Sequence, residues 1–340
     1  MVVYRLDDRS PGEEITFMTW STADFLLGTN AGDVKVVRVN EEEMTFDGFQ
    51  ASHHGINFMA LDRAGRLLAV VARKSELCIW NWTDEDGWSR EHRLPAPDSR
   101  LAVGEPVAIT SLNWSNVEEG TLIVSYLNHG VLQWKVATQT FDSLLNIDKV
   151  YSGSLSPDGR FFAIPNRKLT FDLHDLRSKS KVDTFKDPEA LTHSASLLTQ
   201  QLRPGVFLHE GRYFVGASVG KINLWNTTRN IRAQHLNLGE DFIDAPVAFL
   251  TVSQTGADDL IDNFRIATCV QGPKQQIEVW KAREYLKAAN ILPAAVAGNA
   301  APVTDYWMNR GCQAATVVAG LIGGIIGGAA VRAFANGLPP

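Results

Sequence analysis

Cysteine is scarce in this chain, which holds only Cys78, Cys269 and Cys312 in 340 residues. So few cysteines, in an odd number, do not form the disulfide framework of a small secreted scaffold. Cys78 and Cys269 lie within apolar runs, so we expect buried thiols there. The N-terminal residues also lack the basic and apolar regions of a secretory signal peptide. We therefore expect a domain that faces the reducing cytosol.

The chain lacks both a strong charge imbalance and the common motifs of catalytic sites. Its net charge of −6 offers no general attraction to the phosphates of nucleic acid. The sequence contains no HExxH, CxxC or Walker motif, and its eight histidines are dispersed without an evident nucleophile–base arrangement. We therefore predict no cofactor, no metal site and no catalytic residues, and expect a protein that is not an enzyme.

Short apolar runs separated by polar turns are what the sequence does contain. The runs 67–72 and 77–82 are joined by a polar turn, and a third run at 56–61 precedes them. Three strands joined by turns of three or four residues form a β-meander. A single meander cannot bury both of its faces, so it needs neighbours of the same kind.

The same pattern recurs along the chain. Its first strands begin at Ile15, Ile56, Ile109, Val150, Val206 and Val247. Two further runs follow each of them, and a fourth candidate often comes next, as at 140–147 and 181–185. Six such units of roughly 40–55 residues predict an all-β fold of the β-propeller type. Nearly continuous apolar runs such as 161–164 are expected of strands that neighbouring blades cover on both faces.

The turn Ser156-Pro-Asp-Gly-Arg160 and a set of strand-closing tryptophans resemble WD40-repeat proteins. These tryptophans are Trp80, Trp134, Trp225 and Trp280, and the resemblance covers residues 1–282. Asn or Lys follows each of them, never Asp, so the family's Asp–His–Ser–Trp network is not carried over. The resemblance implies a propeller that binds protein or peptide partners through its rim loops. We expect all four tryptophans to be buried between blades.

The two ends of the repeat region are expected to complete each other. Val2–Leu6 is a predicted strand without a hairpin partner, and the sixth unit has no outer strand after Trp280. Pairing of these two would remove two exposed sheet edges. The count favours six blades. Seven blades are the alternative, with residues 186–203 as a distorted blade.

The composition changes beyond the repeats. Residues 283–313 are predicted to hold a short helix that ends at Pro293 and then a linker rich in Ala, Gly and Pro. Residues 314–331 carry no charge, and as a helix they would extend about 27 Å, close to the ~30 Å hydrocarbon core of a bilayer. We predict a single-pass tail anchor at 314–334, with the propeller in the cytosol.

Glycines and one cysteine fit this membrane prediction. Gly320, Gly324 and Gly328 recur every four residues, a spacing that lets helices pack closely in lipid. Cys312 stands just outside the span and is a candidate for palmitoylation. The alternative is a cytoplasmic adaptor whose apolar tail associates with itself.

Loop carboxylates leave a hydrolase with a divalent metal as the other alternative. They cluster at residues 84–87 and at Asp241, Asp244, Asp258, Asp259 and Asp262. Because these groups stand in connecting loops, we expect solvated side chains instead. His53 and His54 enter a blade from a loop, where capping or packing is expected. The sequence therefore predicts a non-catalytic interaction scaffold, tethered to a membrane.

Overall fold

The structure, a computed structural model, describes the strand-rich part of the chain. The described residues are 14–20, 24–39, 44–97, 104–166, 170–186, 204–218, 220–237, 247–254, 264–270 and 276–281. None of them lies in an α-helix. The expected first strand Val2–Leu6, residues 187–203 and the whole tail after Lys281 lie outside this part.

The strands form five four-stranded antiparallel sheets and one three-stranded sheet. Sheets 1 to 3 consist of β1 (Ile15–Trp20), β2 (Asp24–Thr29), β3 (Asp33–Val39), β4 (Met44–Gln50); β5 (Ile56–Leu61), β6 (Leu67–Ala72), β7 (Glu76–Thr83), β8 (Gly87–Leu94); and β9 (Ile109–Trp114), β10 (Thr121–Tyr126), β11 (Gly130–Lys135), β12 (Thr140–Leu145). Sheets 4 to 6 consist of β13 (Ser154–Leu155), β14 (Phe161–Pro165), β15 (Phe171–Asp175), β16 (Ser180–Phe185); β17 (Gly205–Leu208), β18 (Tyr213–Ala217), β19 (Lys221–Asn226), β20 (Ile231–Asn237); and β21 (Val247–Gln254), β22 (Phe264–Val270), β23 (Gln276–Lys281).

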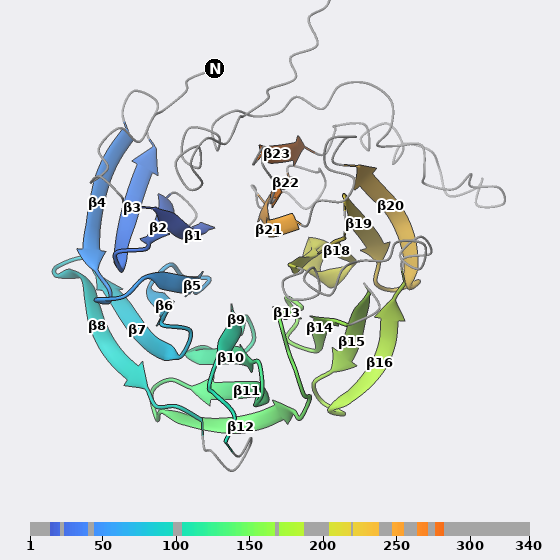
Figure 1. Cartoon of the computed structure of the whole chain (residues 1–340), viewed down its shortest axis with the longest axis horizontal. Coiled ribbons are helices and arrows are strands. Elements are labelled where there is room, and N and C mark those ends of the chain that lie inside the picture. The colour runs from blue at the N-terminus through green and yellow to red at the C-terminus, as the bar shows by residue number, and fades with distance from the viewer. Residues whose placement is uncertain are drawn as a thin grey trace, which may run out of the picture.

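The sheets follow one another around a common centre, in a propeller-like arrangement (Figure 1). The first strands lie innermost, and each contacts the first strand of the next sheet, from β1 through β5, β9, β13 and β17 to β21. The fourth strands β4, β8, β12, β16 and β20 lie on the outside. Residues of β1, β5, β9, β13 and β21 line one cavity of about 290 Å³ between the inner strands. The prediction of an all-β chain of repeated four-stranded units is confirmed for the described residues.

Neighbouring sheets cover each other, which explains the nearly continuous apolar runs. One apolar cluster joins sheets 1 and 2, the next joins sheets 2 and 3, and another joins sheets 4 and 5. Five of the six residues of β6 are buried, as are all six of β10. A strand with only one covered face would bury alternate residues.

The first strand of sheet 4 is much shorter than expected. The run 150–155 predicts a full strand, but only Ser154–Leu155 pairs with β14. The start of the run instead bonds to sheet 3. The backbone N–H of Val150 donates to the carbonyl of Leu127 at 3.0 Å, and its carbonyl accepts from the Thr110 hydroxyl at 2.8 Å. The third strand of sheet 4 also lies two residues later than the predicted 169–173, as β15.

No helix in the described part of the chain combines the length and apolarity that a membrane crossing requires. The expected anchor at 314–334, its glycines Gly320, Gly324 and Gly328, and Cys312 all lie outside that part. They therefore stay predictions.

Candidate binding cleft

Three of the expected tryptophans occupy matching places in their sheets. Trp80, Trp134 and Trp225 are 9%, 0% and 1% exposed. The indole N–H of Trp134 donates to the Tyr126 hydroxyl at 3.1 Å, and that of Trp225 donates to the carbonyl of Lys186 at 3.0 Å. Trp280 lies in β23, and its side chain falls outside the described part. The indoles of Trp80, Trp134 and Trp225 therefore lie in the interior between sheets.

Sheet 4 has a histidine at the position where sheets 2, 3, 5 and 6 have tryptophan. His174 lies opposite Phe162, as Trp80 lies opposite Leu68 in sheet 2. Burial of the His174 imidazole lowers its pKa. The next residue is Asp175, so this sheet alone among the described ones has an acid directly after the tryptophan position. The sequence prediction missed this pair because it followed tryptophans and placed β15 two residues too early.

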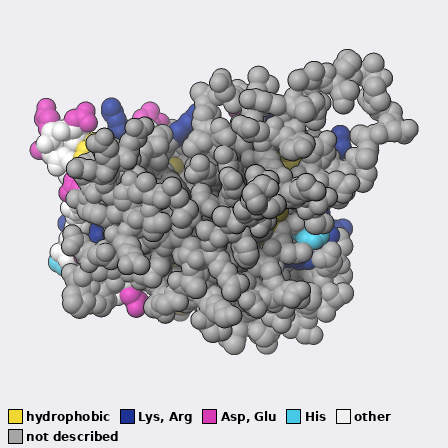
Figure 2. All heavy atoms as spheres, turned by 90° about the horizontal axis from the view of Figure 1, so that it is seen from above, with side chains coloured by type: hydrophobic (Ala, Val, Ile, Leu, Met, Phe, Trp, Pro, Cys, Tyr) yellow, Lys and Arg dark blue, Asp and Glu magenta, His cyan; other side chains and the backbone are white. Residues whose placement is uncertain are grey.

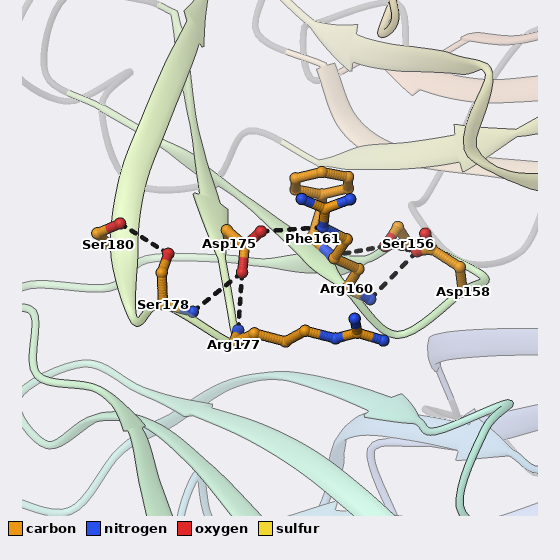
Figure 3. A network of polar contacts seen from close by, with 8 residues as sticks. All are labelled: Ser156, Asp158, Arg160, Phe161, Asp175, Arg177, Ser178 and Ser180. Atoms are coloured by element: carbon orange, nitrogen blue, oxygen red, sulfur yellow. Dashed lines mark hydrogen bonds and ion pairs between the residues drawn. The ribbon is translucent and has the colours of Figure 1, made fainter.

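Asp175 connects two turns of sheet 4 (Figure 3). Its carboxylate accepts the backbone N–H groups of Arg177 at 2.8 Å and Ser178 at 3.0 Å, and the Nε–H of Arg160 at 2.9 Å. Arg160 also places its guanidinium 4.7 Å from the centre of the Phe161 ring. The network holds the hairpin ends together, so its role is structural. Residues 177–181, which include one arginine and two lysines, thus contribute backbone N–H groups that anchor this turn.

The charge of Asp175 should make stability depend on pH at the acid end. The N–H of Ser178 and the Arg160 guanidinium lower the pKa of Asp175 from its ordinary value of 3.8. A carboxyl whose pKa falls on folding stabilises the folded state above its unfolded pKa, and loses that effect as the pH falls through the folded value. We expect Asp175→Asn to be less stable than the natural chain at pH 5–7. The difference should shrink below about pH 4, as urea unfolding would measure. A difference independent of pH would contradict this.

The inner cavity does not assemble reactive side chains. Apolar residues such as Met18, Met59 and Leu112 line much of it. Thr16 and Thr110, which the sequence places on inner strands, instead donate to the carbonyls of Ile56 and Val150 in the next sheet. Among the described residues, no group of three His, Cys, Asp or Glu side chains is placed to hold a metal ion. The aspartates from Asp241 to Asp262 lie outside the described part, so the metal alternative stays a prediction there.

A cleft of about 520 Å³ lies between sheets 1 and 2. We call it the sheet 1–2 cleft. The connection from β4 to β5, the turn from β6 to β7, and strands β7 and β8 supply its walls. Its lining residues are Gln50, Ala51, Ser52, His53, His54, Arg73, Glu76, Trp80, Arg90 and Arg93. His53 and His54, for which the sequence suggested only capping or packing, therefore face a surface cleft.

The cleft is lined mainly by positive charge. Three arginines face one carboxylate, that of Glu76. Arg93 lies 3.4 Å from Glu76, but its side chain is 68% exposed, so water weakens this pair. Arg73 and Arg90 form no ion pair with any described residue. Burial raises the pKa of the nearby Cys78 thiol, so this cysteine adds no negative charge beside Arg90.

The loop at the cleft's edge is held by sheet 1. The carbonyl of Gly32 accepts the N–H groups of both Ala51 and Ser52 at 3.0 Å. The Ser52 hydroxyl oxygen accepts the N–H of His54 at 3.1 Å. Gly32 itself has φ +93° and lies so close to this loop that a Cβ would stand 2.7 Å from the carbonyl oxygen of His54. A fixed backbone therefore presents the histidines.

Trp80 is the aromatic residue that lines the cleft, and other rings support it from behind. Trp80 packs against Phe49 with 4.5 Å between ring centres, and Phe49 in turn stacks on Trp88 at 5.9 Å. Unlike Trp134 and Trp225, Trp80 has no acceptor for its buried indole N–H among the described residues. An indole N–H is only a donor, and buried donors are normally paired. This nitrogen is fully buried and therefore lies behind the surface of the cleft.

The comparisons with known proteins give no further guide. No protein-family model matches the chain, and no curated protein matches its sequence.

Proposed function

We propose that this chain is a non-catalytic protein-interaction scaffold, and that a segment of its partner binds in the sheet 1–2 cleft. The cleft itself supports the proposal, because it combines three arginines with a buried tryptophan. Arg and Trp are the residue types most often found at the energetic centres of protein interfaces. Loops held on rigid sheets are also where binding residues concentrate.

The scaffold that we propose is a six-bladed, WD40-like β-propeller. The inner strands that contact one another in chain order support it, as does sheet 6, which has three strands among the described residues where the other sheets have four. We propose that Val2–Leu6 supplies that strand and closes the ring. Deletion of residues 1–7 should then lower the melting temperature strongly, since it uncovers two strand edges. A melting temperature equal to that of the full chain would contradict closure.

We also propose that residues 314–334 tether the scaffold to a membrane, with the propeller in the cytosol. The uncharged run and the spacing of Gly320, Gly324 and Gly328 support this. Full-length protein should remain with membranes through an alkaline carbonate wash, whereas residues 1–310 should appear in the soluble fraction. Release of the full-length chain by carbonate would favour the soluble adaptor with a self-associating tail.

Partner capture with charge-reversed variants tests the binding proposal. The full-length chain and its Arg73→Glu/Arg93→Glu variant would be used to isolate bound proteins from cells. The matched control is Arg63→Glu/Arg66→Glu, which makes the same change of charge at exposed positions in the turn between β5 and β6, at the other end of the strands. We expect the cleft variant to lose partners that the control keeps. Identical sets of partners with both variants would refute the cleft as the binding site.

A further inference from the structure

We propose that the sheet 1–2 cleft recognises a phosphorylated serine or threonine of the partner protein, so that binding depends on phosphorylation. This inference rests on the proposed function and specifies its ligand. The cleft's charge, its volume and the turn that carries Arg73 each support it.

The balance of charge in the cleft fits a phosphomonoester. Arg73, Arg90 and Arg93 supply three positive charges and Glu76 one negative charge, which leaves two positive charges. A phosphorylated side chain carries about −1.5 to −2 charges at pH 7 and three strong acceptor oxygens, whereas an Asp or Glu side chain carries −1. The phosphate therefore neutralises the cleft and a single carboxylate does not. Guanidinium groups also bind phosphate oxygens in a two-pronged geometry.

A neutral donor of the cleft adds to these charges. The Ser52 hydroxyl oxygen accepts the N–H of His54, and its proton stays free to donate to a ligand. Trp80 also lines the cleft, but its indole nitrogen is fully buried, so we do not count this N–H among the donors that face a ligand.

The volume of the cleft indicates a ligand larger than a free anion. At about 520 Å³ the cleft lies within the roughly 300–1,000 Å³ of typical ligand pockets. Ala51 and the ring of Trp80 give it apolar surface beside the charges. A phosphorylated side chain with its flanking residues fits this mixture of surfaces better than inorganic phosphate does.

The turn that carries Arg73 has side chains at positive φ where three other sheets have glycine. In sheets 1, 3 and 5 the turn between the second and third strands has glycine at positive φ, namely Gly32, Gly130 and Gly220. In sheet 2 Arg73 and Lys74 take φ of 52° and 64° instead. The left-handed region is unfavourable for side chains other than Gly, Asn and Asp. Other turns of the chain contain such residues too, Gln139 and Lys179 among them, so it is the position of Arg73 in the cleft that gives this strain a functional meaning.

Backbone contacts hold this turn in place. The N–H of Lys74 donates to the Asn57 side-chain oxygen at 2.7 Å, and the carbonyl of Lys74 accepts the N–H of Ile109 at 2.6 Å. The turn is thereby fixed to sheets 2 and 3 while the Arg73 side chain lines the cleft. With the backbone of the turn fixed, only the Arg73 side chain must be ordered when the cleft binds an anion.

The positive charge is local, which favours one phosphorylated residue over an extended polyanion. Acidic and basic side chains are interspersed among the described residues visible in Figure 2. Nucleic acid binding normally requires a continuous basic face, and the net charge of the chain is −6.

The test measures binding of labelled peptides to the full-length chain in mild detergent. The probes are three fluorescein-labelled peptide libraries with four randomised residues on each side of a fixed phosphoserine, serine or glutamate. We expect the phosphoserine library to bind at least tenfold more tightly than the other two in fluorescence anisotropy. Millimolar inorganic phosphate should compete. Equal binding of the serine and phosphoserine libraries would overturn the proposal.

Two variants of the strained turn separate binding from folding. Arg73→Asn and Lys74→Gly each introduce a residue that adopts positive φ easily, so both should raise the melting temperature by about 2–4 °C. Arg73→Asn should weaken phosphoserine binding at least tenfold, because it removes a charge from the cleft. Lys74→Gly should bind within twofold of the natural chain, since Lys74 does not line the cleft. Unchanged binding by Arg73→Asn would overturn the proposal.

A lipid headgroup is the competing source of phosphate. The full-length chain and its Arg73→Asn variant should bind equally to vesicles of phosphatidylcholine with 5% phosphatidylinositol phosphate. If Arg73→Asn abolishes vesicle binding, and the phosphoserine library does not bind, the cleft is a lipid site and the proposal fails.

Failure of this inference can be told apart from failure of the scaffold function. If partners need Arg73 and Arg93 but bind equally well after phosphatase treatment, the scaffold function is supported and only the dependence on phosphorylation is refuted. If partners bind whether or not both arginines are present, the cleft is not their binding site.

Discussion

Replacing Trp225 by alanine is expected to lower the free energy of unfolding by about 3–5 kcal/mol, as large-to-small changes of buried aromatic residues commonly do. The indole is 1% exposed between sheets 4 and 5. Its ring centre lies 5.7 Å from that of Phe185, 5.9 Å from that of Phe171 and 6.0 Å from that of Phe214. Alanine would remove these contacts and leave a cavity that the three neighbouring rings cannot readily fill.

Two further variants show which part of Trp225 matters. Trp225→Phe keeps a ring but loses the hydrogen bond to Lys186, so we expect a smaller cost of about 1–2 kcal/mol. Ile231→Ala changes a residue of the same sheet that is 51% exposed, and should cost well under 1 kcal/mol. Circular dichroism in urea would measure all three. A Trp225→Ala cost no larger than that of Ile231→Ala would show that the sheet 4–5 interface is loosely packed.

The strands could be predicted because their signals are local. Apolar runs between Gly-, Asn- and Asp-rich turns predicted strands such as 56–61, 67–72 and 213–217, and β5, β6 and β18 have these bounds. Turn chemistry and burial on both faces act within a few residues of sequence. The repeat then placed the strands in a common order.

The errors concern sheet 4. The run 150–155 has the composition of a strand, yet only Ser154–Leu155 pairs with β14, while Val150 bonds to Leu127 and Thr110. Thr16 makes the same bond to Ile56, which begins a full strand, so this contact alone does not shorten β13. His174 replaces a tryptophan, so a search for tryptophans passed over it.

The sheet 1–2 cleft was hidden from the sequence. Its charges come from separate segments, with Arg73 in one turn and Arg90 and Arg93 in an outer strand. Each arginine taken alone is an ordinary exposed side chain. The positive φ of Arg73 and the unpaired N–H of Trp80 are properties of the folded chain only. The pair His53-His54 was the one visible signal.

Gly32→Ala should be the most damaging change in the cleft's support, with an expected cost of about 2–5 kcal/mol. Two effects add. At φ +93° the backbone conformation of an alanine costs about 1–2 kcal/mol of folding free energy. Its Cβ would also meet the carbonyl oxygens of Ser52 and His54, and crowding of this kind costs about 1–3 kcal/mol. Neither oxygen can move alone, because both belong to the backbone of one loop.

Gly120→Ala separates the two effects. Gly120 has φ +68° and nothing within 4 Å of the position that a Cβ would take, so alanine there meets only the conformational cost. Urea unfolding should therefore show a loss of about 1–2 kcal/mol for Gly120→Ala and a clearly larger loss for Gly32→Ala. The Gly32 variant should also bind the phosphoserine library more weakly, since the loop with Ser52 and His54 must move, while the Gly120 variant should bind it normally. Equal losses of stability in the two variants would mean that the loop yields freely, and that the close approach of Gly32 does not position the cleft.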